Sequence, residues 1–118
     1  MESRQWYVVN TKPRNEERSA MNLEQGGIEV LAPKLRFRRW KEGKFIDIIE
    51  PMFPGYIFVK FHPVDEFHLV KYTRGVKTIV NFNGRIIPLQ KGLIEFIRGR
   101  LVEGVATVER KTFKKGEK

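Results

Sequence analysis

The side chains in this sequence with the clearest chemical role are clusters of lysine and arginine, which can bind anions. One cluster, Lys12, Arg14 and Arg18, lies where a predicted strand meets a predicted helix. Arg14 and Arg18 are four residues apart and share a face if the helix begins early enough. Together with N–H groups at the helix start, they could hold phosphates. Alternatively, this is a solvated helix face on which Glu16 and Glu17 are local ion-pair partners.

The second cluster is denser and contains aromatic residues. Residues 34–44 hold one acid, Glu42, and six basic residues: Lys34, Arg36, Arg38, Arg39, Lys41 and Lys44. On a strand, Arg36, Arg38 and Trp40 alternate onto one side. This layout suits a surface that follows a nucleic-acid backbone and stacks on its bases. The alternative is a hairpin tip that is charged only for solubility.

A third basic site follows a predicted short helix. Thr73 and Arg74 stand directly before Gly75, which permits a sharp exit from the helix. Such a turn would leave Thr73 and Arg74 with free hydrogen-bond donors for a ligand. In the alternative, Arg74 is an ordinary cation at a helix end, where it meets the negative end of the helix dipole.

The sequence offers little for catalysis. The two histidines, His62 and His68, are six residues apart, do not share a helical face well, and lie in no metal-binding or catalytic motif. The chain has no cysteine, which excludes disulfides and thiolate metal sites and fits a reducing compartment. It also has no phosphate-binding loop or dinucleotide motif. We therefore predict a protein that is not an enzyme and that holds neither a metal nor a cofactor.

The charge balance favours a polyanionic partner. The chain has 23 Lys and Arg against 14 Asp and Glu, for a formal net charge of +9. Nucleic acid is the first candidate and an anionic membrane surface the second, although the charge could also serve solubility alone. The apolar runs are far shorter than the roughly 20 residues of a membrane span. The first residues lack the apolar stretch of a signal peptide, so a cytoplasmic protein is expected.

The stretch EPMFPGYIFVKF, residues 50–61, carries four aromatic residues and two prolines. The prolines interrupt regular strand pairing, so Phe53 is expected in a fixed loop before the strand YIFVKF. In that strand the side chains of Tyr56 and Phe58 point to one side and the aliphatic ones to the other. If the core needs only the aliphatic side, Phe53, Tyr56 and Phe58 form a surplus apolar surface that marks a docking site. Alternatively both sides are buried, one by helices and the other by the basic ribbon.

The order of elements predicts an α+β fold. Strands are expected at residues 6–11, 28–32, 35–40, 44–49, 56–61, 76–82 and 85–88, and helices within residues 15–27, 64–73 and 90–101. Asn15 is the expected helix cap, Gly26 and Gly27 the helix stop, and Asn83-Gly84 the centre of a type I′ hairpin turn. A β-α-β-β-α-β core of this kind is the ferredoxin-like antiparallel sheet with helices on one face, here with a basic hairpin added. Residues 1–104 form this domain, and residues 105–118 are expected to be a basic linker.

Several of these residues resemble one family. WYVV at 6–9, Lys-Pro-Arg before an acidic helix, and EPMFPGYIFV at 50–59 resemble the N-terminal (NGN) domain of the NusG transcription elongation factors. The turn TRGV at 73–76 is similar to the specialised RfaH-type paralogues. The match runs from Trp6 to about Leu101, and FKKGEK at 113–118 resembles the start of the KOW barrel that follows in this family. The chain would then end at the linker, before the KOW domain.

The resemblance implies a transcription elongation and antitermination factor that suppresses pausing and termination. The domain would bind the clamp helices of the largest RNA polymerase subunit as a monomer, through an apolar patch at Phe53, Pro54, Tyr56 and Phe58. Asn10 falls where RfaH-type members carry an aromatic residue of that patch. Glu50 matches the acid that pairs with the C-terminal KOW domain in the closed state of RfaH.

The resemblance also implies a nucleic-acid surface. RfaH-type members contact the non-template DNA strand through positions that match Lys12, Arg14, Arg18, Lys71, Thr73 and Arg74. Some specialised paralogues read hairpins in the nascent RNA, for which Arg36 and Arg38 of the ribbon are candidates. The alternative function is a stand-alone RNA-binding module, because ferredoxin-like sheets commonly present aromatic residues to single strands.

Overall fold

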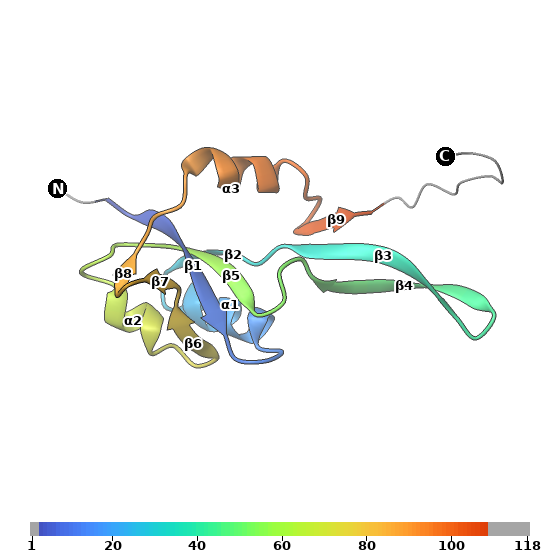
Figure 1. The fold of residues 1–118 in the computed structure, drawn as a ribbon, viewed down its shortest axis with the longest axis horizontal. Coiled ribbons are helices and arrows are strands. Elements are labelled where there is room, and N and C mark those ends of the chain that lie inside the picture. Colours follow the sequence, from blue (N-terminus) through green and yellow to red (C-terminus); the bar gives the residue numbers. More distant parts are fainter. Residues whose placement is uncertain (1–2, 109–118) are drawn as a thin grey trace.

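The computed structural model describes residues 3–108, and its centre is a four-stranded sheet (Figure 1). The strands of this sheet are β1 (Gln5–Thr11), β2 (Glu29–Leu31), β5 (Tyr56–Phe61) and β6 (Val76–Ile79). They lie in the order β2-β5-β1-β6, and every neighbouring pair is antiparallel. This is the arrangement of a β-α-β-β-α-β core, so the predicted α+β, ferredoxin-like class is confirmed.

Two helices, α1 (Glu16–Gln25) and α2 (Phe67–Lys71), pack on one face of this sheet. The core on this side contains the aliphatic side of β5 together with Leu23 of α1 and Val70 of α2. Asn15 precedes α1, but its side chain donates to the carbonyl oxygen of Pro13 at 2.8 Å and makes no cap hydrogen bond. The predicted side-chain cap is therefore wrong, although Gly26 follows the last residue of α1 as its C-cap, as expected.

The third helix, α3 (Lys91–Arg98), lies on the opposite face of the sheet (Figure 1). Ile94 and Ile97 are buried there against Trp6 and Phe58. The prediction that helices cover one face holds for α1 and α2 but is wrong for α3. The second face of the sheet is thus closed as well, because α3 is amphipathic and buries its apolar side on it.

A basic ribbon projects from this body, as Figure 1 shows. It consists of β3 (Lys34–Lys41) and β4 (Lys44–Pro51), which pair in antiparallel register along their whole length. Glu42 and Gly43 connect them with φ angles of 51° and 81°. Positive φ at both central residues is typical of the tight type I′ hairpin turn, so the predicted ribbon is confirmed.

A short strand, β9 (Val105–Thr107), pairs in parallel with β3. The sequence placed the start of the linker at residue 105, so these first residues are strand and not linker. A turn at Glu103 and Gly104, with φ angles of 50° and 82°, directs these residues onto β3. The carbonyl oxygen of Gly104 accepts a hydrogen bond from the Lys34 N–H at 3.0 Å. The remaining predicted linker, with Phe113 and the expected start of a KOW domain, lies outside the described residues.

The predicted hairpin around Asn83-Gly84 is present but shorter than expected. Its strands are β7 (Asn81–Phe82) and β8 (Arg85–Ile86), and both turn residues have positive φ. The residues before it instead form β6, which pairs with β1. This pairing prevails because it buries Val76 and Ile79 in the core, as the exposed hairpin could not.

An ion pair joins the residue before β1 to the residue before α2. The guanidinium of Arg4 donates to both carboxylate oxygens of Glu66, at 2.9 and 2.8 Å. This contact lowers the pKa of Glu66 to about 2. The same carboxylate accepts the backbone N–H of His62 at 2.8 Å, so it also organises the loop before α2.

Between residues 3 and 108, no helix is long and apolar enough to cross a membrane, and no group of His, Cys, Asp and Glu is arranged to hold a metal ion.

Candidate functional site

The aromatic loop before β5 is a tight turn. The backbone N–H of Tyr56 donates to the carbonyl oxygen of Phe53 at 2.9 Å, so Pro54 and Gly55 are the two central residues. Gly55 has a φ of 85°. Proline followed by a residue with positive φ is typical of a type II turn, which favours glycine in the second place. The sequence FPGY therefore sets Phe53 and Tyr56 at the two ends of one rigid turn.

Three hydrogen bonds from distant residues hold this turn in place. The N–H of Gly55 donates to a carboxylate oxygen of Glu16 at 2.7 Å. Its carbonyl oxygen accepts the backbone N–H of Thr11 at 2.8 Å and the side-chain amide of Asn10 at 2.7 Å. From the sequence, Glu16 was expected only as a local ion-pair partner, and Asn10 was given no such role. No local pattern signals these contacts, because the partners are 39 and 45 residues apart.

The turn exposes part of the predicted apolar patch. The exposed fractions of Phe53 and Tyr56 are 39% and 45%, and Pro54 is also exposed. Phe58 is only 7% exposed, since it is buried with Ile94 and Ile97 of α3. The prediction that Phe58 belongs to an open docking surface is therefore wrong for this structure.

The buried ring of Phe58 packs against the exposed aromatic turn residue Phe53. Its ring meets that of Phe53 edge to face, with centroids 5.5 Å apart. Both sides of β5 are thus buried, as in the alternative reading of the sequence, but α3 covers the second side and the ribbon does not. The exposed apolar surface is smaller than predicted and consists of Phe53, Pro54 and Tyr56, which we call the aromatic turn.

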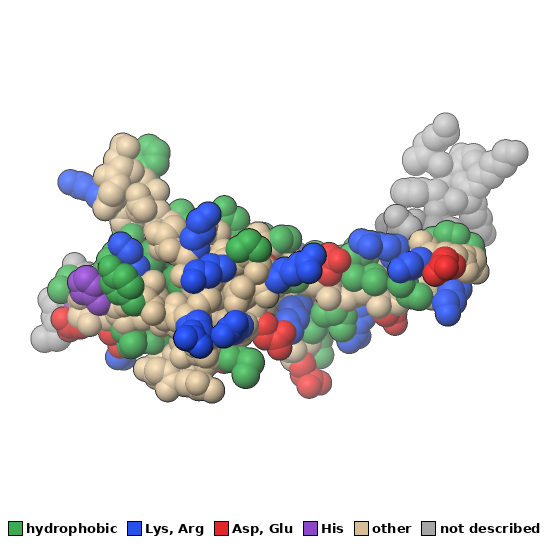
Figure 2. Space-filling view, turned by 90° about the horizontal axis from the view of Figure 1, so that it is seen from below, with side chains coloured by type: hydrophobic (Ala, Val, Ile, Leu, Met, Phe, Trp, Pro, Cys, Tyr) green, Lys and Arg blue, Asp and Glu red, His purple; other side chains and the backbone are tan. Residues whose placement is uncertain are grey.

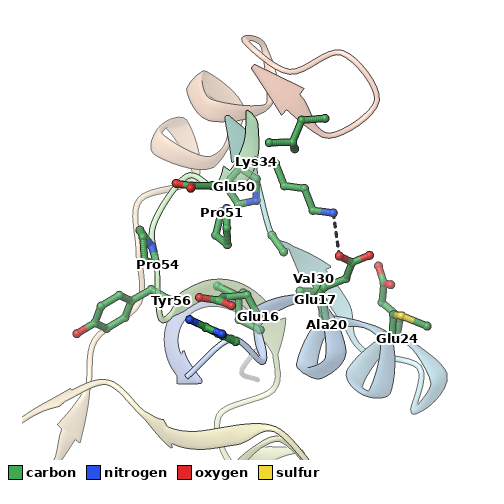
Figure 3. A pocket seen from close by; sticks show the side chains of 16 residues that line it. Glu16, Glu17, Ala20, Glu24, Val30, Lys34, Glu50, Pro51, Pro54 and Tyr56 are labelled. Atoms are coloured by element: carbon green, nitrogen blue, oxygen red, sulfur yellow. Dashed lines mark hydrogen bonds and ion pairs between the residues drawn. The ribbon is translucent and has the colours of Figure 1, made fainter. Parts of the chain in front are cut away.

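A hollow of about 700 Å³ opens beside the aromatic turn, between α1 and the base of the ribbon (Figure 3). Its apolar lining includes Ala20, Val30 and Pro51, and it continues onto Pro54 and Tyr56 of the turn. Acidic side chains also line it, namely Glu16, Glu17, Glu24 and Glu50. This hollow thus combines an apolar lining with four acids and two cations, Arg14 and Lys34.

Glu50, the expected contact of a further domain, lies at this hollow and has an exposed side chain. Within residues 3–108 its ion-pair partner is Arg39 on the neighbouring strand, at a long distance of 4.0 Å. Lys34 instead bridges to Glu17 of α1 at 3.0 Å, as Figure 3 shows. The carboxylate of Glu50 therefore remains accessible to another molecule or domain.

The structure brings part of the predicted basic surface together. The N–H of Lys12 donates to the carbonyl oxygen of Gly75 at 2.9 Å. The side-chain amide of Asn22 donates to the backbone carbonyl oxygen of Arg74 at 3.0 Å. Arg18 is exposed one helical turn before Asn22 on α1. Lys12, Arg18 and Arg74 therefore lie on neighbouring segments of one side, which we call the basic face. Figure 2 views the molecule from this side and shows Lys and Arg side chains both on the body and along the ribbon.

Gly75 is required at this junction. Its φ is 99°, and a Cβ atom there would lie 2.4 Å from the hydroxyl oxygen of Ser19. Ser19 is fully buried in α1, so the turn and the helix are in direct contact. The close approach of Gly75 to Ser19 fixes where Arg74 leaves the body.

Two predicted residues of the basic face behave differently. Arg14 has a φ of 61° and precedes α1, which begins at Glu16, so Arg14 and Arg18 do not share a helical face and that prediction is wrong. Arg14 lines the hollow beside the aromatic turn. Thr73 was expected to have free hydrogen-bond donors. Its hydroxyl instead donates to the carbonyl oxygen of Leu69 at 2.6 Å, and its N–H donates to the carbonyl oxygen of Val70 at 3.3 Å. That prediction is also wrong, because the donors close the end of α2.

Arg74 and Lys71 remain available. Arg74 is exposed, and no hydrogen bond or ion pair engages its guanidinium within the part of the chain that the structure describes. The amine of Lys71 lies 5.8 Å from the ring centroids of Phe67 and Tyr72. Both cations therefore present charge beside the end of α2.

Arg36 and Arg38 lie on the ribbon, apart from the basic face. The register pairs Arg38 with Asp47 and Trp40 with Phe45, which confirms that Arg36, Arg38 and Trp40 share one side. The guanidinium of Arg38 lies 4.6 Å from the Phe45 centroid, and the Trp40 and Phe45 rings meet edge to face at 4.9 Å. The predicted nucleic-acid residues thus occupy two separate surfaces.

Comparison with known proteins decides the family. Residues 4–98 match the family model described as "Transcription termination factor nusG". The chain belongs to the NusG family. This is a family of transcription factors, in agreement with the predicted lack of enzymatic activity.

Individual relatives agree with this membership. Two proteins named "Transcription termination/antitermination protein NusG", from two strains of Staphylococcus epidermidis, are 29% identical over 92 residues, which is 70% of this chain. The chain spans about half the length of these curated relatives. A solved structure titled "Domain interaction in Thermotoga maritima NusG" is 26% identical, with a TM-score of 0.57, and the match covers 80% of this chain and 55% of that one.

Proposed function

We propose that this chain is the NGN domain of a transcription elongation and antitermination factor that binds RNA polymerase through the aromatic turn. The observation that carries the proposal is the rigid presentation of Phe53, Pro54 and Tyr56, which are exposed on a turn fixed by Glu16 and Asn10. A preorganised aromatic anchor loses little conformational entropy on binding, which favours affinity. The proposed partner is the clamp-helix segment of the largest polymerase subunit, as the resemblance implies.

No chemical step is required for this function. A domain that binds one conformation of the clamp better than another shifts the polymerase toward that conformation. Suppression of pausing and termination then follows if the favoured conformation is the one that elongates.

The basic face supports recruitment through nucleic acid. Lys12, Arg18, Lys71 and Arg74 lie on the segments that meet at the Gly75 turn, so they can contact the phosphates of one strand. We propose the non-template DNA strand as the ligand of this face. Arg14 lies at the aromatic turn and Thr73 is bonded internally, so their proposed share of the nucleic-acid contact is smaller.

The similarity of TRGV to RfaH-type paralogues supports a specialised role for this protein rather than a housekeeping one. We further propose that the chain continues through a basic linker into a KOW domain. The accessible Glu50 beside the hollow could then pair with a cation of that domain. The domain is proposed to act as a monomer.

The second candidate function is a stand-alone RNA-binding module. The arginines of the ribbon favour it, since Arg36 and Arg38 share one side and the guanidinium of Arg38 lies 4.6 Å from the ring centroid of the exposed Phe45. The sheet itself does not, because α3 buries Trp6 and Phe58 on the face that would receive a single strand. Such a module would therefore not hold RNA on this face of the sheet. Filter binding of hairpin RNA and single-stranded DNA, with and without polymerase, separates the two functions.

The proposed function is tested by polymerase binding to variants of the aromatic turn. Phe53→Ala and Tyr56→Ala are expected to weaken binding of core RNA polymerase strongly, because aromatic anchors often contribute more than about 2 kcal/mol each. Circular dichroism checks that both variants remain folded, as the partial exposure of Phe53 and Tyr56 predicts.

Matched controls come from the same chain. Phe45→Ala on the ribbon and Tyr72→Ala after α2 remove the same side chains from exposed positions, at 48% and 72% exposure, away from the turn. Both should bind core polymerase normally. Normal binding by a folded Phe53→Ala, Tyr56→Ala double variant would overturn the proposal.

A further inference from the structure

We infer that Tyr72, stacked on His68, is a platform for an unpaired base of a single-stranded nucleic acid. The inference rests on the proposed recruitment function and deepens it, since it names a group that holds a base beside the cations that hold phosphates. Single-stranded DNA and an unpaired RNA loop offer the same chemistry, a base face joined to a phosphate, and the test below distinguishes them.

The ring of Tyr72 is held in a fixed orientation. His68 and Tyr72 are one helical turn apart, and their rings are nearly parallel, with an interplanar angle of 7° and centroids 5.8 Å apart. The N–H of Tyr72 donates to the carbonyl of His68 at 3.0 Å, which fixes the backbone as well. Phe67 supports the imidazole from the side, perpendicular to it at 5.9 Å. The phenol therefore continues a stack of rings that begins on α2.

This ring does not contribute to the core. Tyr72 is 72% exposed, whereas Val70, the residue by which α2 packs on the sheet, is 0% exposed. Stacking with His68 occupies one side of the phenol. The ring nonetheless remains 72% exposed, and exposed, ordered aromatic rings are what proteins use to stack on the bases of single strands.

Positive charge surrounds the ring. The amine of Lys71 lies 5.8 Å from the Tyr72 centroid, and the exposed Arg74 follows two residues later. The backbone contact from Lys12 to Gly75 brings the start of the basic face to the same turn. Two acids precede α2: Glu66 is neutralised by Arg4, and Asp65 lies 3.8 Å from the Nδ1 atom of His62. A strand whose base lies on Tyr72 could therefore place its flanking phosphates against Lys71 and Arg74.

The charge favours nucleic acid over an apolar protein surface as the occupant. Leu69 is 48% exposed on α2, so a protein contact is the competing possibility. A protein partner would have to leave Lys71 and Arg74 unpaired or supply acids for both, whereas a nucleic-acid strand supplies a phosphate at every nucleotide.

The test measures oligonucleotide binding by fluorescence anisotropy for the chain and three variants. Tyr72→Phe keeps the ring and should bind as the unmodified chain does. Tyr72→Ala should raise Kd by about 5- to 140-fold, the range expected from loss of one base–aromatic stack. The probes are labelled single-stranded DNA and hairpin RNA of matched loop sequence. Whichever probe shows the difference identifies the source of the base.

A second set of probes tests the base directly. Each nucleotide in turn is replaced by an abasic one, so that the phosphate stays and the base is removed. At the position that stacks on the platform, the difference between Tyr72 and Tyr72→Ala should disappear, because the partner of the ring is absent. Arg74→Ala should behave differently and reduce the slope of log K against log salt by about 0.7 for a single strand, while Tyr72→Ala should leave this slope unchanged.

Three results would overturn the inference. The first is that Tyr72→Ala and the unmodified chain bind both probes with equal affinity, or that neither protein binds any probe. The second is a Tyr72→Ala penalty that persists at every abasic position. The third is loss of core polymerase binding by Tyr72→Ala with oligonucleotide binding unchanged, which would assign the ring to a protein contact. Failure of the proposed polymerase function would instead appear as normal polymerase binding by the folded Phe53→Ala, Tyr56→Ala double variant, so the two failures are distinguishable.

Discussion

Substitution of Gly75 by alanine should strongly destabilise the junction between the basic face and α1. Two costs add at this position. The φ of 99° is unfavourable for any residue with a Cβ, and such backbone strain costs about 1–3 kcal/mol. The new Cβ would also lie 2.4 Å from the Ser19 hydroxyl and 3.3 Å from the Ser19 backbone. Since Ser19 is fully buried, it has little room to move, and the second cost adds to the first.

Ser19→Ala separates these two costs. The hydroxyl of Ser19 is buried without a hydrogen-bond partner, and an unsatisfied buried polar group costs about 1–3 kcal/mol. Ser19→Ala should therefore be neutral or stabilising. Gly75→Ala should be less destabilising in the Ser19→Ala background than in the native one, because the closest contact is gone. The coupling energy is expected at about 0.5–3 kcal/mol, as for residues in direct contact.

Urea unfolding followed by circular dichroism measures all four members of this cycle. Gly84→Ala is the matched control, because its φ of 81° is also positive but a Cβ there meets nothing within 4 Å. It should show the backbone cost alone. The reasoning is refuted if Gly75→Ala is no more destabilising than Gly84→Ala, or if the Ser19 and Gly75 effects simply add.

Three further predictions follow from the same contacts. Phe58→Ala should lower the free energy of unfolding by about 3–5 kcal/mol in urea titrations, because it empties a core site, whereas Phe53→Ala should cost much less. Glu66→Gln should make unfolding less sensitive to acid: the pKa of Glu66 is lowered from 4.5 to about 2, so its stabilisation is complete above 4.5 and lost as the pH falls toward 2. A pH titration of stability that is unchanged by this variant would contradict the assignment. Glu16→Ala should lower the free energy of unfolding in urea by about 1.5–3 kcal/mol, because it removes the charged acceptor of the Gly55 N–H. It should also weaken polymerase binding. Glu16→Gln should retain more of the stability and more of the binding.

Much of the fold could be predicted because alternation and turn chemistry are local signals. The strand at residues 56–61 shows this, since its alternate residues Ile57, Val59 and Phe61 are all buried on the α1 and α2 side. The placement of α3 could not be predicted in the same way. Its periodicity shows that it has an apolar side, but not which face of the sheet that side covers. The error on Phe58 follows directly, because its burial depends on α3.

The candidate site was predictable to a similar degree. The sequence FPGY already indicates a turn with Phe53 and Tyr56 at its ends. The residues that hold this turn, Glu16 and Asn10, are distant in sequence and became visible only in the folded chain. Strand β9 was missed for a related reason, since three residues in parallel pairing give almost no periodic signal.

The most direct measurement of the polymerase proposal is site-specific photo-crosslinking from the aromatic turn. Tyr56 is replaced by a photoreactive phenylalanine derivative, the chain is mixed with core RNA polymerase, and the crosslinked peptide is identified by mass spectrometry. The proposal predicts a crosslink to the clamp helices of the largest subunit. The same replacement at Tyr72, which is more exposed, should give no crosslink there. A crosslink from Tyr56 to another part of the enzyme, or none at all, would contradict the proposal.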